Sequence, residues 1–226
     1  MASESAQLPD HLKFNREHFD GIAHKYDEHP MAAKLASHTS SAMLASYPFD
    51  EETTSVLEFA CGTGLVSREL APHAKVIVGV DISQGMVDQY NLRVSNQGIS
   101  AEEMHAECVE LKGEEGELGG QKFDVVVCAQ AYHHFPSIES VTKILAFFLK
   151  PGGALLVVDL IHTDESEELH RSHVLMVPHK GGFEEPHVRA AFDFAGLEQF
   201  SFKPVTKVTV NSHEMQLFFA KGVKPL

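Results

Sequence analysis

The sequence predicts one α/β domain built around a doubly wound, mostly parallel sheet, and two observations lead to this prediction. Short apolar runs alternate with helical segments along most of the chain, which is the rhythm of strand–helix–strand units. The runs VIVGV, VVVC and ALLVVDL are apolar throughout rather than alternating, as expected for strands that have helices on both faces. A chain of 226 residues, of which 43% are hydrophobic and 22% charged, has enough apolar material for one such core.

The expected elements follow the apolar runs and the helical spacing. Strands are predicted at residues 55–59, 75–80, 123–128 and 153–160, with a weaker strand that ends near Glu107. Helices are predicted at 17–28, 30–46, 65–71, 83–97, 138–149 and 185–195. Two final strands, 198–205 and 214–221, are joined by a short loop, which suggests an antiparallel pair.

The charge balance, and the lack of an apolar run typical of membrane spans or signal peptides, argue against several classes of protein. The chain has 18 Lys and Arg against 32 Asp and Glu, a net charge of −14, which repels nucleic acids. No apolar run is long enough for a membrane span and the polar N-terminus resembles no signal peptide, so we expect a cytoplasmic or nuclear protein. Cys61, Cys108 and Cys128 form no C-x-x-C pair and are interpreted as buried thiols.

A glycine-bearing turn, E-F-A-C-G-T-G at residues 58–64, follows the first predicted strand. The turn therefore lies at the carboxyl edge of the sheet, where open α/β folds bind ligands. Gly62 and Gly64 allow the backbone to approach a ligand closely. Asp81 ends the second strand, where a carboxylate can accept hydrogen bonds from both hydroxyls of a ribose. The alternative role for Asp81 is to cap the next helix, but Ser83 is already well placed for that. The pattern therefore predicts a nucleoside site.

Two nucleoside ligands compete for this site. Gly62-x-Gly64-x-x-Ser67 approaches the G-x-G-x-x-G pattern of nicotinamide-binding proteins, and Asp81 lies 17 residues beyond Gly64. However, Ser67 replaces the third glycine, and Glu58 places a negative charge just before the turn. A pyrophosphate requires backbone N–H groups without a nearby anion, so the balance favours a cationic sulfonium nucleoside.

The runs VLEFACGTGLVSRELA and VIVGVDISQGMVDQY resemble the first two motifs of the class I S-adenosylmethionine-dependent methyltransferases, particularly the UbiE-like small-molecule enzymes. HAECVEL, FDVVVCAQAYHHF and LKPGGALLVVD are similar to the family's third, fourth and fifth strand segments, in the same order. FDGIAHKYD resembles an N-terminal helix whose tyrosine closes over the cofactor. The resemblance spans roughly residues 19–160 and implies a Rossmann-like, seven-stranded sheet, parallel apart from an antiparallel last strand, with helices on both faces.

S-adenosylmethionine is the cofactor that this resemblance implies, with S-adenosylhomocysteine as product. The residues it places at the cofactor are Tyr26, Glu58, Ala60, Gly62, Gly64, Asp81, Ile82, Met86, Glu107, Cys108 and Gln130. Ala60 departs from the family, which usually has glycine there. The single domain, 1–226, would comprise a helical cap (1–50), a cofactor-binding core (51–160), a variable acceptor-side segment (161–196) and a C-terminal strand pair (197–226).

Methyl transfer from a sulfonium is an in-line displacement that needs alignment and exclusion of water, and no metal. A hydroxyl or protonated amine must also lose a proton, for which histidine is suited near neutral pH. His133, just past the fourth strand, is the candidate base, with orientation or packing as the other interpretation. His134 is interpreted as structural, and His170 and His173 in the variable segment as solvated surface residues rather than metal ligands.

We therefore expect a methyltransferase that acts on an oxygen or nitrogen atom of a small molecule, as a monomer or homodimer. A protein methyltransferase acting on a basic tail is one alternative, because the acidic surface would attract such a tail. A cofactor-binding regulatory partner of another protein, without activity of its own, is the other.

Overall fold

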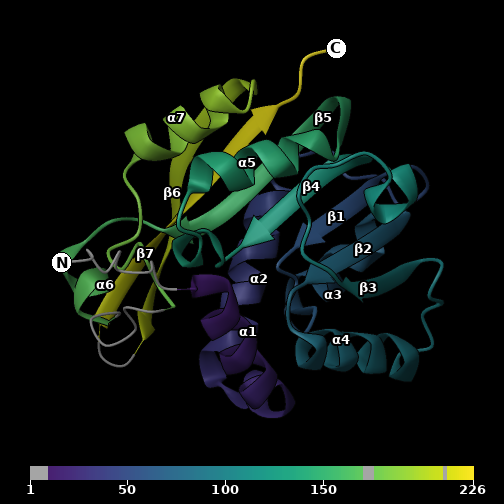
Figure 1. The fold of residues 1–226 in the computed structure, drawn as a ribbon, viewed down its shortest axis with the longest axis horizontal. Coiled ribbons are helices and arrows are strands. Elements are labelled where there is room, and N and C mark those ends of the chain that lie inside the picture. The colour runs from purple at the N-terminus through teal and green to yellow at the C-terminus, as the bar shows by residue number, and fades with distance from the viewer. Residues whose placement is uncertain (1–9, 170–175, 211–212) are drawn as a thin grey trace, which may run out of the picture.

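The computed structural model describes residues 10–169, 176–210 and 213–226, which form one seven-stranded sheet with the order β3-β2-β1-β4-β5-β7-β6 (Figure 1). The strands are β1 (Ser55–Phe59), β2 (Val76–Asp81), β3 (Met104–Cys108), β4 (Phe123–Ala129), β5 (Leu149–Leu160), β6 (Glu198–Val210) and β7 (His213–Val223). The neighbouring strands β3, β2, β1, β4 and β5 pair in parallel, whereas β7 is antiparallel to both β5 and β6. The predicted doubly wound sheet with an antiparallel last strand is confirmed.

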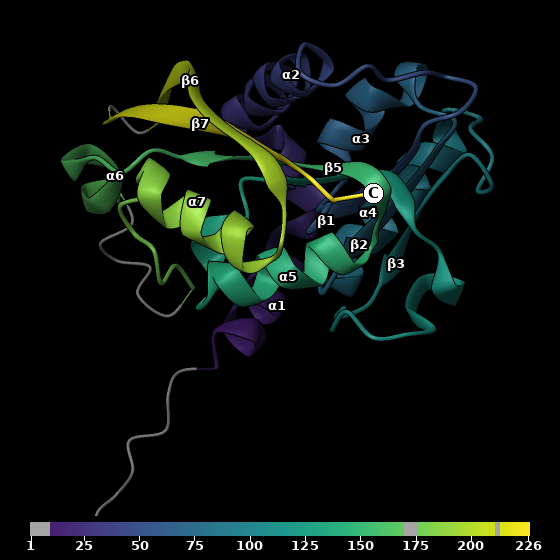
Figure 2. The same cartoon turned by 90° about the horizontal axis from the view of Figure 1, so that it is seen from above.

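Helices cover both faces of this sheet, as Figure 2 shows from above. The helices are α1 (His11–Ile22), α2 (Pro30–Leu44), α3 (Leu65–Leu70), α4 (Gln84–Asn96), α5 (Ile138–Phe147), α6 (Asp164–Leu169) and α7 (Glu185–Phe194). Alternate residues of each central strand face opposite ways: Leu57 packs with the core that includes α5 and α7, and Val56 with the core that includes α2, α3 and α4. No described helix has both the length and the hydrophobicity that crossing a membrane requires.

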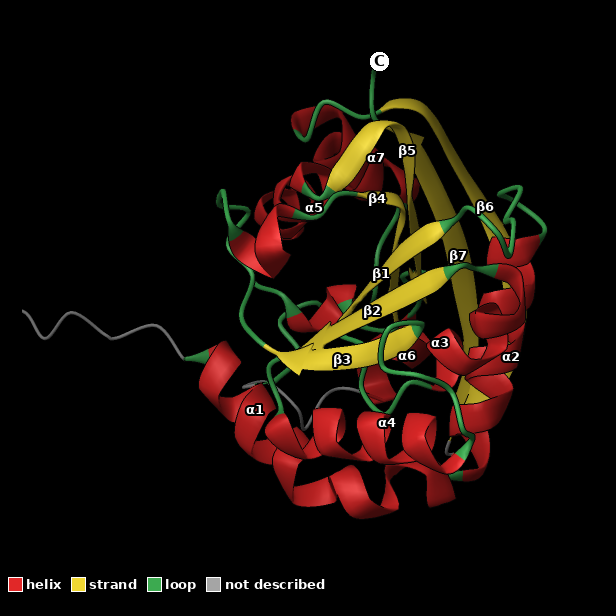
Figure 3. Ribbon diagram, turned by 90° about the vertical axis from the view of Figure 1, so that its right-hand side faces the viewer, coloured by secondary structure: helices red, strands yellow, loops and turns green. Residues whose placement is uncertain are grey.

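The N-terminal region lies at the carboxyl end of the sheet beside α4, where the strand arrows in Figure 3 point. Helix α1 begins at His11, earlier than the predicted start at residue 17, because the Asp10 side chain caps it by accepting from Lys13 N at 3.0 Å. A 3₁₀ segment, η1 (Ala23–Glu28), links α1 to α2. This region is therefore placed over the edge of the sheet that the glycine turn also occupies.

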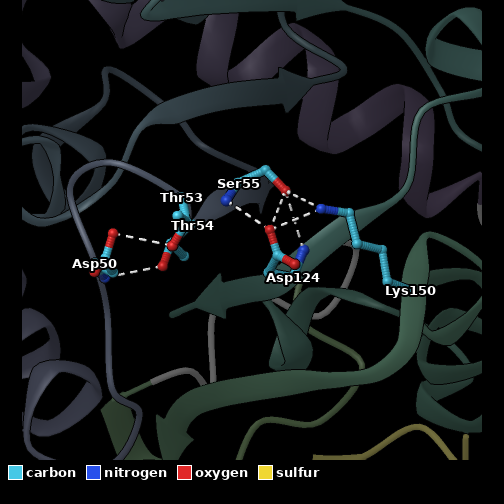
Figure 4. Close-up of polar contacts among 6 residues, drawn as sticks. All are labelled: Asp50, Thr53, Thr54, Ser55, Asp124 and Lys150. Atoms are coloured by element: carbon cyan, nitrogen blue, oxygen red, sulfur yellow. Dashed lines mark hydrogen bonds and ion pairs between the residues drawn. The ribbon is translucent and has the colours of Figure 1, made fainter.

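A polar cluster joins β1, β4 and β5 near the ends at which these strands begin, away from the cavity-bearing edge of the sheet (Figure 4). Asp124 Oδ2 accepts hydrogen bonds from Ser55 N at 2.9 Å, Ser55 Oγ at 2.6 Å and Lys150 Nζ at 2.8 Å. Burial opposes ionisation of Asp124, but these donors hold its pKa below the usual value. In the preceding loop Asp50 Oδ1 accepts from Thr53 Oγ1 at 2.9 Å. The cluster fixes where β1, β4 and β5 begin, and hence where they end at the ligand-binding edge.

Candidate active site

A cavity of about 530 Å³ lies at the carboxyl ends of β1, β2 and β4. The glycine turn and Asp81 form its wall on the sheet side, and α1, η1 and α2 form the opposite wall. Residues from α5 and from the loop after β3 complete it. The cavity therefore occupies the position at which open α/β sheets bind ligands.

The turn after β1 adopts left-handed backbone at three positions. Ala60, Gly62 and Gly64 have φ angles of +56°, +52° and +81°, a region that side chains with a Cβ resist. A Cβ at Gly62 would meet no atom within 4 Å, so this glycine leaves room on the cavity side. A Cβ at Gly64 would lie 2.5 Å from Tyr90 Cδ2. Gly62 thus borders the cavity, whereas Gly64 allows α3 to pack against the Tyr90 ring.

Asp81 is held in place by the backbone on both sides. Its Oδ2 accepts from Gly62 N at 2.8 Å and its Oδ1 from Ser83 N at 2.9 Å. The side chain is nearly buried, and this burial raises the pKa of Asp81 despite the hydrogen bonds that favour its charged form. A carboxylate oxygen accepts more than one hydrogen bond, so Asp81 retains acceptor capacity towards a ligand.

Glu58 connects β1 to α3 beneath the turn. Its Oε2 accepts from Ser67 N at 2.9 Å and from the Ser67 hydroxyl. Burial raises the pKa of Glu58 to about 7, against the lowering effect of these two hydrogen bonds. Ser67, in place of the third glycine of a dinucleotide pattern, therefore has a specific function here as the hydrogen-bond partner of Glu58.

The N-terminal region is attached to the turns of the sheet by side-chain hydrogen bonds. Asp20 Oδ1 accepts from Ser83 Oγ at 2.6 Å and from Gly85 N at 3.0 Å. Asp27 accepts from Thr63 Oγ1 at 2.6 Å and forms an ion pair with Arg93. These contacts bring Tyr26 to the cavity wall, where burial raises the pKa of its hydroxyl.

The structure brings together most of the residues predicted to bind the cofactor. Those that line the cavity are Tyr26, Glu58, Ala60, Gly62, Asp81, Ile82, Met86 and Gln130. Gln130 also has a left-handed backbone, with φ of +54°, as Ala60 does at the end of the neighbouring strand. Strained backbone at non-glycine residues is often found at functional sites.

Glu107 and Cys108, which the resemblance places at the cofactor, do not line the cavity. Cys108 still pairs with Asp81 in the sheet. The side chains of Glu107 and Cys108 are exposed, so the interpretation of Cys108 as a buried thiol was wrong. The chain reaches the cavity only after β3 ends, so Val109, Glu110 and Leu111 line it instead. The register of β3 explains this displacement.

The two histidines after β4 differ from their predicted places. His133, the candidate base, is buried with Nδ1 2.7 Å from Asp159 Oδ1 and does not line the cavity. Burial opposes ionisation of Asp159, but the His133 imidazole holds its pKa below the usual value. His134, interpreted as structural, does line the cavity, and its Nδ1 lies 2.9 Å from the Met176 carbonyl oxygen.

Several residues at the cavity were not predicted. Asn15 and Thr39 line it from α1 and α2, and each has a buried side-chain oxygen without a hydrogen-bond partner in the described chain.

His170 and His173 lie outside the described residues. Within the described ranges, no group of three or more metal-binding side chains is present.

The comparisons with known proteins agree with this fold. Residues 56–153 match the family model described as Methyltransferase domain. An uncharacterized methyltransferase of Schizosaccharomyces pombe is 41% identical over 150 residues, which are 63% of this chain and 53% of the relative. The ubiquinone biosynthesis O-methyltransferase of Coxiella burnetii is 31% identical over 100 residues, 44% of this chain and 41% of that enzyme.

Among solved structures, magnesium protoporphyrin IX methyltransferase from Synechocystis PCC 6803 with bound S-adenosylmethionine superposes with a TM-score of 0.67. It is 15% identical and the match covers 97% of this chain and 99% of that one, so it supports the fold. A mostly parallel α/β sheet with a cavity at the carboxyl ends of its strands defines the general class of this protein. Residues 56–153 are therefore similar to methyltransferase domains, and the chain spans about half the length of the curated relatives it matches.

Proposed function

We propose that this protein transfers the methyl group of S-adenosylmethionine to an oxygen or nitrogen atom of a small molecule. The observation that carries this proposal is the cavity itself. One wall holds the glycine turn and Asp81, and the opposite wall consists of residues from α1, η1 and α2. A single space therefore offers both a cofactor site and room for an acceptor beside it.

The residues present fit S-adenosylmethionine. Gly62 leaves open space beside the turn, and Asp81 retains acceptor capacity for a ribose hydroxyl. Thr39 Oγ1 is a buried hydroxyl at the wall without a partner in the described chain, so it can donate to a ligand. The cofactor carries a net positive charge, which suits the carboxylates of this cavity.

When bound, S-adenosylmethionine supplies an electrophilic methyl group on a positively charged sulfur. The chain has to bind it, orient the acceptor in line and keep water away. In this proposal Asp81 binds the ribose, Ile82 and Met86 provide apolar contacts beside it, and Tyr26 covers the site. The hydrogen bonds of Asp20 and Asp27 to the turns hold this cover in place.

The name of the Coxiella relative, a ubiquinone biosynthesis O-methyltransferase, supports a small-molecule acceptor with a hydroxyl group. A basic protein tail is the alternative, since the chain has a net charge of −14. Incubation of the purified protein with methyl-labelled S-adenosylmethionine separates these possibilities. We expect label transfer with a metabolite extract and none with histone-like peptides.

Transfer to the peptides alone would replace the small-molecule proposal with a protein methyltransferase. S-adenosylhomocysteine binding without transfer to either acceptor source would instead favour the regulatory partner without activity.

A further inference from the structure

We propose that Glu58 determines the preference of this protein for S-adenosylmethionine over S-adenosylhomocysteine, because its carboxylate stabilises the positive sulfur of the first and gains nothing from the neutral sulfur of the second. This inference rests on the proposed function and names the residue that separates the substrate of the cavity from its product. The two nucleosides differ only in the transferred methyl group and in the charge that it gives to sulfur. A carboxylate that faces the cavity can distinguish them by that charge.

The two oxygens of the Glu58 carboxylate have different surroundings. Oε2 accepts hydrogen bonds from Ser67 N at 2.9 Å and from the Ser67 hydroxyl. Oε1 accepts no hydrogen bond in the described chain, and it is not one of the side-chain atoms that the described protein encloses without a partner. Because Glu58 lines the cavity, Oε1 is the oxygen that a ligand can reach.

Burial makes the charge of Glu58 sensitive to a ligand. Only 3% of Glu58 is exposed, and water screens a charge poorly at such a position. The nearly buried Asp81 lines the same cavity, and its carboxylate disfavours a second negative charge on Glu58. A positive charge bound in the cavity offsets both the burial and this repulsion, so it stabilises the Glu58 carboxylate.

A bound sulfonium therefore competes with a proton for Glu58. Burial raises the pKa of Glu58 to about 7, against the two hydrogen bonds from Ser67. Since Oε2 accepts both of these bonds, the proton of the neutral acid belongs on Oε1. Binding of the sulfonium lowers this pKa, and the proton passes to the buffer. By the same linkage, S-adenosylmethionine binds more tightly as the pH rises, whereas the uncharged sulfur of S-adenosylhomocysteine has no such effect.

Other titratable groups interact with Glu58, and in the described chain these are Asp81, Tyr90, Cys61 and Cys128. Burial raises the pKa of the Tyr90 hydroxyl and of both thiols, so these three groups stay neutral near pH 7. Burial also raises the pKa of Asp81, but Asp81 is present with and without a substitution at Glu58. A pH effect that Glu58→Gln removes therefore belongs to Glu58.

Calorimetric titration of both nucleosides at about pH 5.5 and about pH 7.5 tests the inference. Glu58→Gln resembles the protonated acid in shape and still has an oxygen that accepts from Ser67. Glu69→Gln is the matched control, because Glu69 is an exposed acid on α3. In the unaltered protein and in the control, we expect the preference for S-adenosylmethionine to increase about fivefold or more between the two pH values. In Glu58→Gln it should keep the value that the unaltered protein has at the lower pH.

Proton release provides a second measurement, which requires no variant. Titrations at about pH 6.5 in two buffers with different ionisation enthalpies give the number of protons released on binding. We expect each molecule of S-adenosylmethionine to release about half a proton more than S-adenosylhomocysteine does. This difference should disappear in Glu58→Gln.

A preference that does not change with pH in the unaltered protein would overturn the inference, as would a pH-dependent preference that persists in Glu58→Gln. Equal proton release by the two nucleosides would also overturn it, and this result decides the matter if Glu58→Gln does not fold. Failure of both nucleosides to bind the unaltered protein would count against the proposed function instead, so the two failures are distinct.

Discussion

The carboxylate of Asp20 lies 2.6 Å from the hydroxyl of Ser83, which joins the N-terminal helix to the turn after β2. The same Asp20 oxygen accepts from Gly85 N at 3.0 Å. Ser83 Oγ in turn caps α4 by accepting from Met86 N at 3.1 Å. The cover over the cavity and the strand that carries Asp81 are therefore connected through one carboxylate.

Replacing Asp20 with alanine should weaken S-adenosylhomocysteine binding about tenfold, since hydrogen bonds to a charged group contribute about 1.5–3 kcal/mol. Calorimetric titration measures this change. Glu17→Ala is the matched control on the same helix, because Glu17 makes only an exposed contact with Lys13 at 3.9 Å. Equal affinities of the two variants would show that the Asp20 contact does not hold the cover in place.

The two glycines of the turn should respond differently to alanine. Gly64→Ala should lower the free energy of unfolding by about 2–4 kcal/mol, because it adds a clash with Tyr90 to an unfavourable backbone. Gly62→Ala meets no neighbour and should cost about 1–2 kcal/mol, but it should weaken cofactor binding because its methyl group enters the cavity. Denaturant unfolding and S-adenosylhomocysteine titration of both variants separate the effects, and a Gly62 variant with unchanged affinity would contradict the assignment.

Ala60→Gly should stabilise the fold by up to about 1 kcal/mol. Ala60 has a φ of +56°, and a left-handed conformation costs an alanine about 1–2 kcal/mol, of which the greater chain entropy of glycine offsets a part. Ala129→Gly, at the end of the adjacent β4, should instead destabilise by about 0.5–1 kcal/mol. The comparison of their denaturant midpoints checks the prediction, and destabilisation by both changes would refute it.

Glu58 should make stability fall as the pH rises. Its pKa is about 7 in the fold, raised by burial, against about 4.3 in the unfolded chain. The folded state therefore holds more protons between these values, and its stability decreases from about pH 4 until the pH passes about 7. The unfolding free energy of the wild type relative to Glu58→Gln should drop by about 3 kcal/mol over this window. A difference that does not change with pH would rule out the raised pKa.

Local patterns in the sequence predicted the parts of the site that depend on local structure. The strand–turn–helix run at residues 58–70 places Glu58, Ala60 and Gly62 by chain connectivity alone, and Asp81 follows from the parallel pairing of β1 with β2. The apolar runs predicted the parallel sheet, whereas the family resemblance implied its antiparallel last strand, with support from the two C-terminal strand signals.

Other parts depend on contacts that no local pattern contains. The hydrogen bond from Asn15 to Met176 joins residues 161 positions apart. His133 and His134 are neighbours in one 3₁₀ turn, and only the turn geometry decides which faces Asp159 and which the cavity. Asp20 accepts hydrogen bonds from a turn far away in the chain. Nothing in the sequence distinguishes it from the other acidic residues of the predicted helices.

The central claim is most directly tested by calorimetric titration of S-adenosylmethionine, S-adenosylhomocysteine and NAD into the purified protein and into Asp81→Ala. Asp88→Ala is the matched control, since Asp88 is an exposed acid on α4 that accepts only from Gln84. The account predicts binding of both sulfur nucleosides, about tenfold or more weaker in Asp81→Ala and unchanged in Asp88→Ala, with no binding of NAD. Binding of NAD alone, or of none of the three ligands, would contradict it.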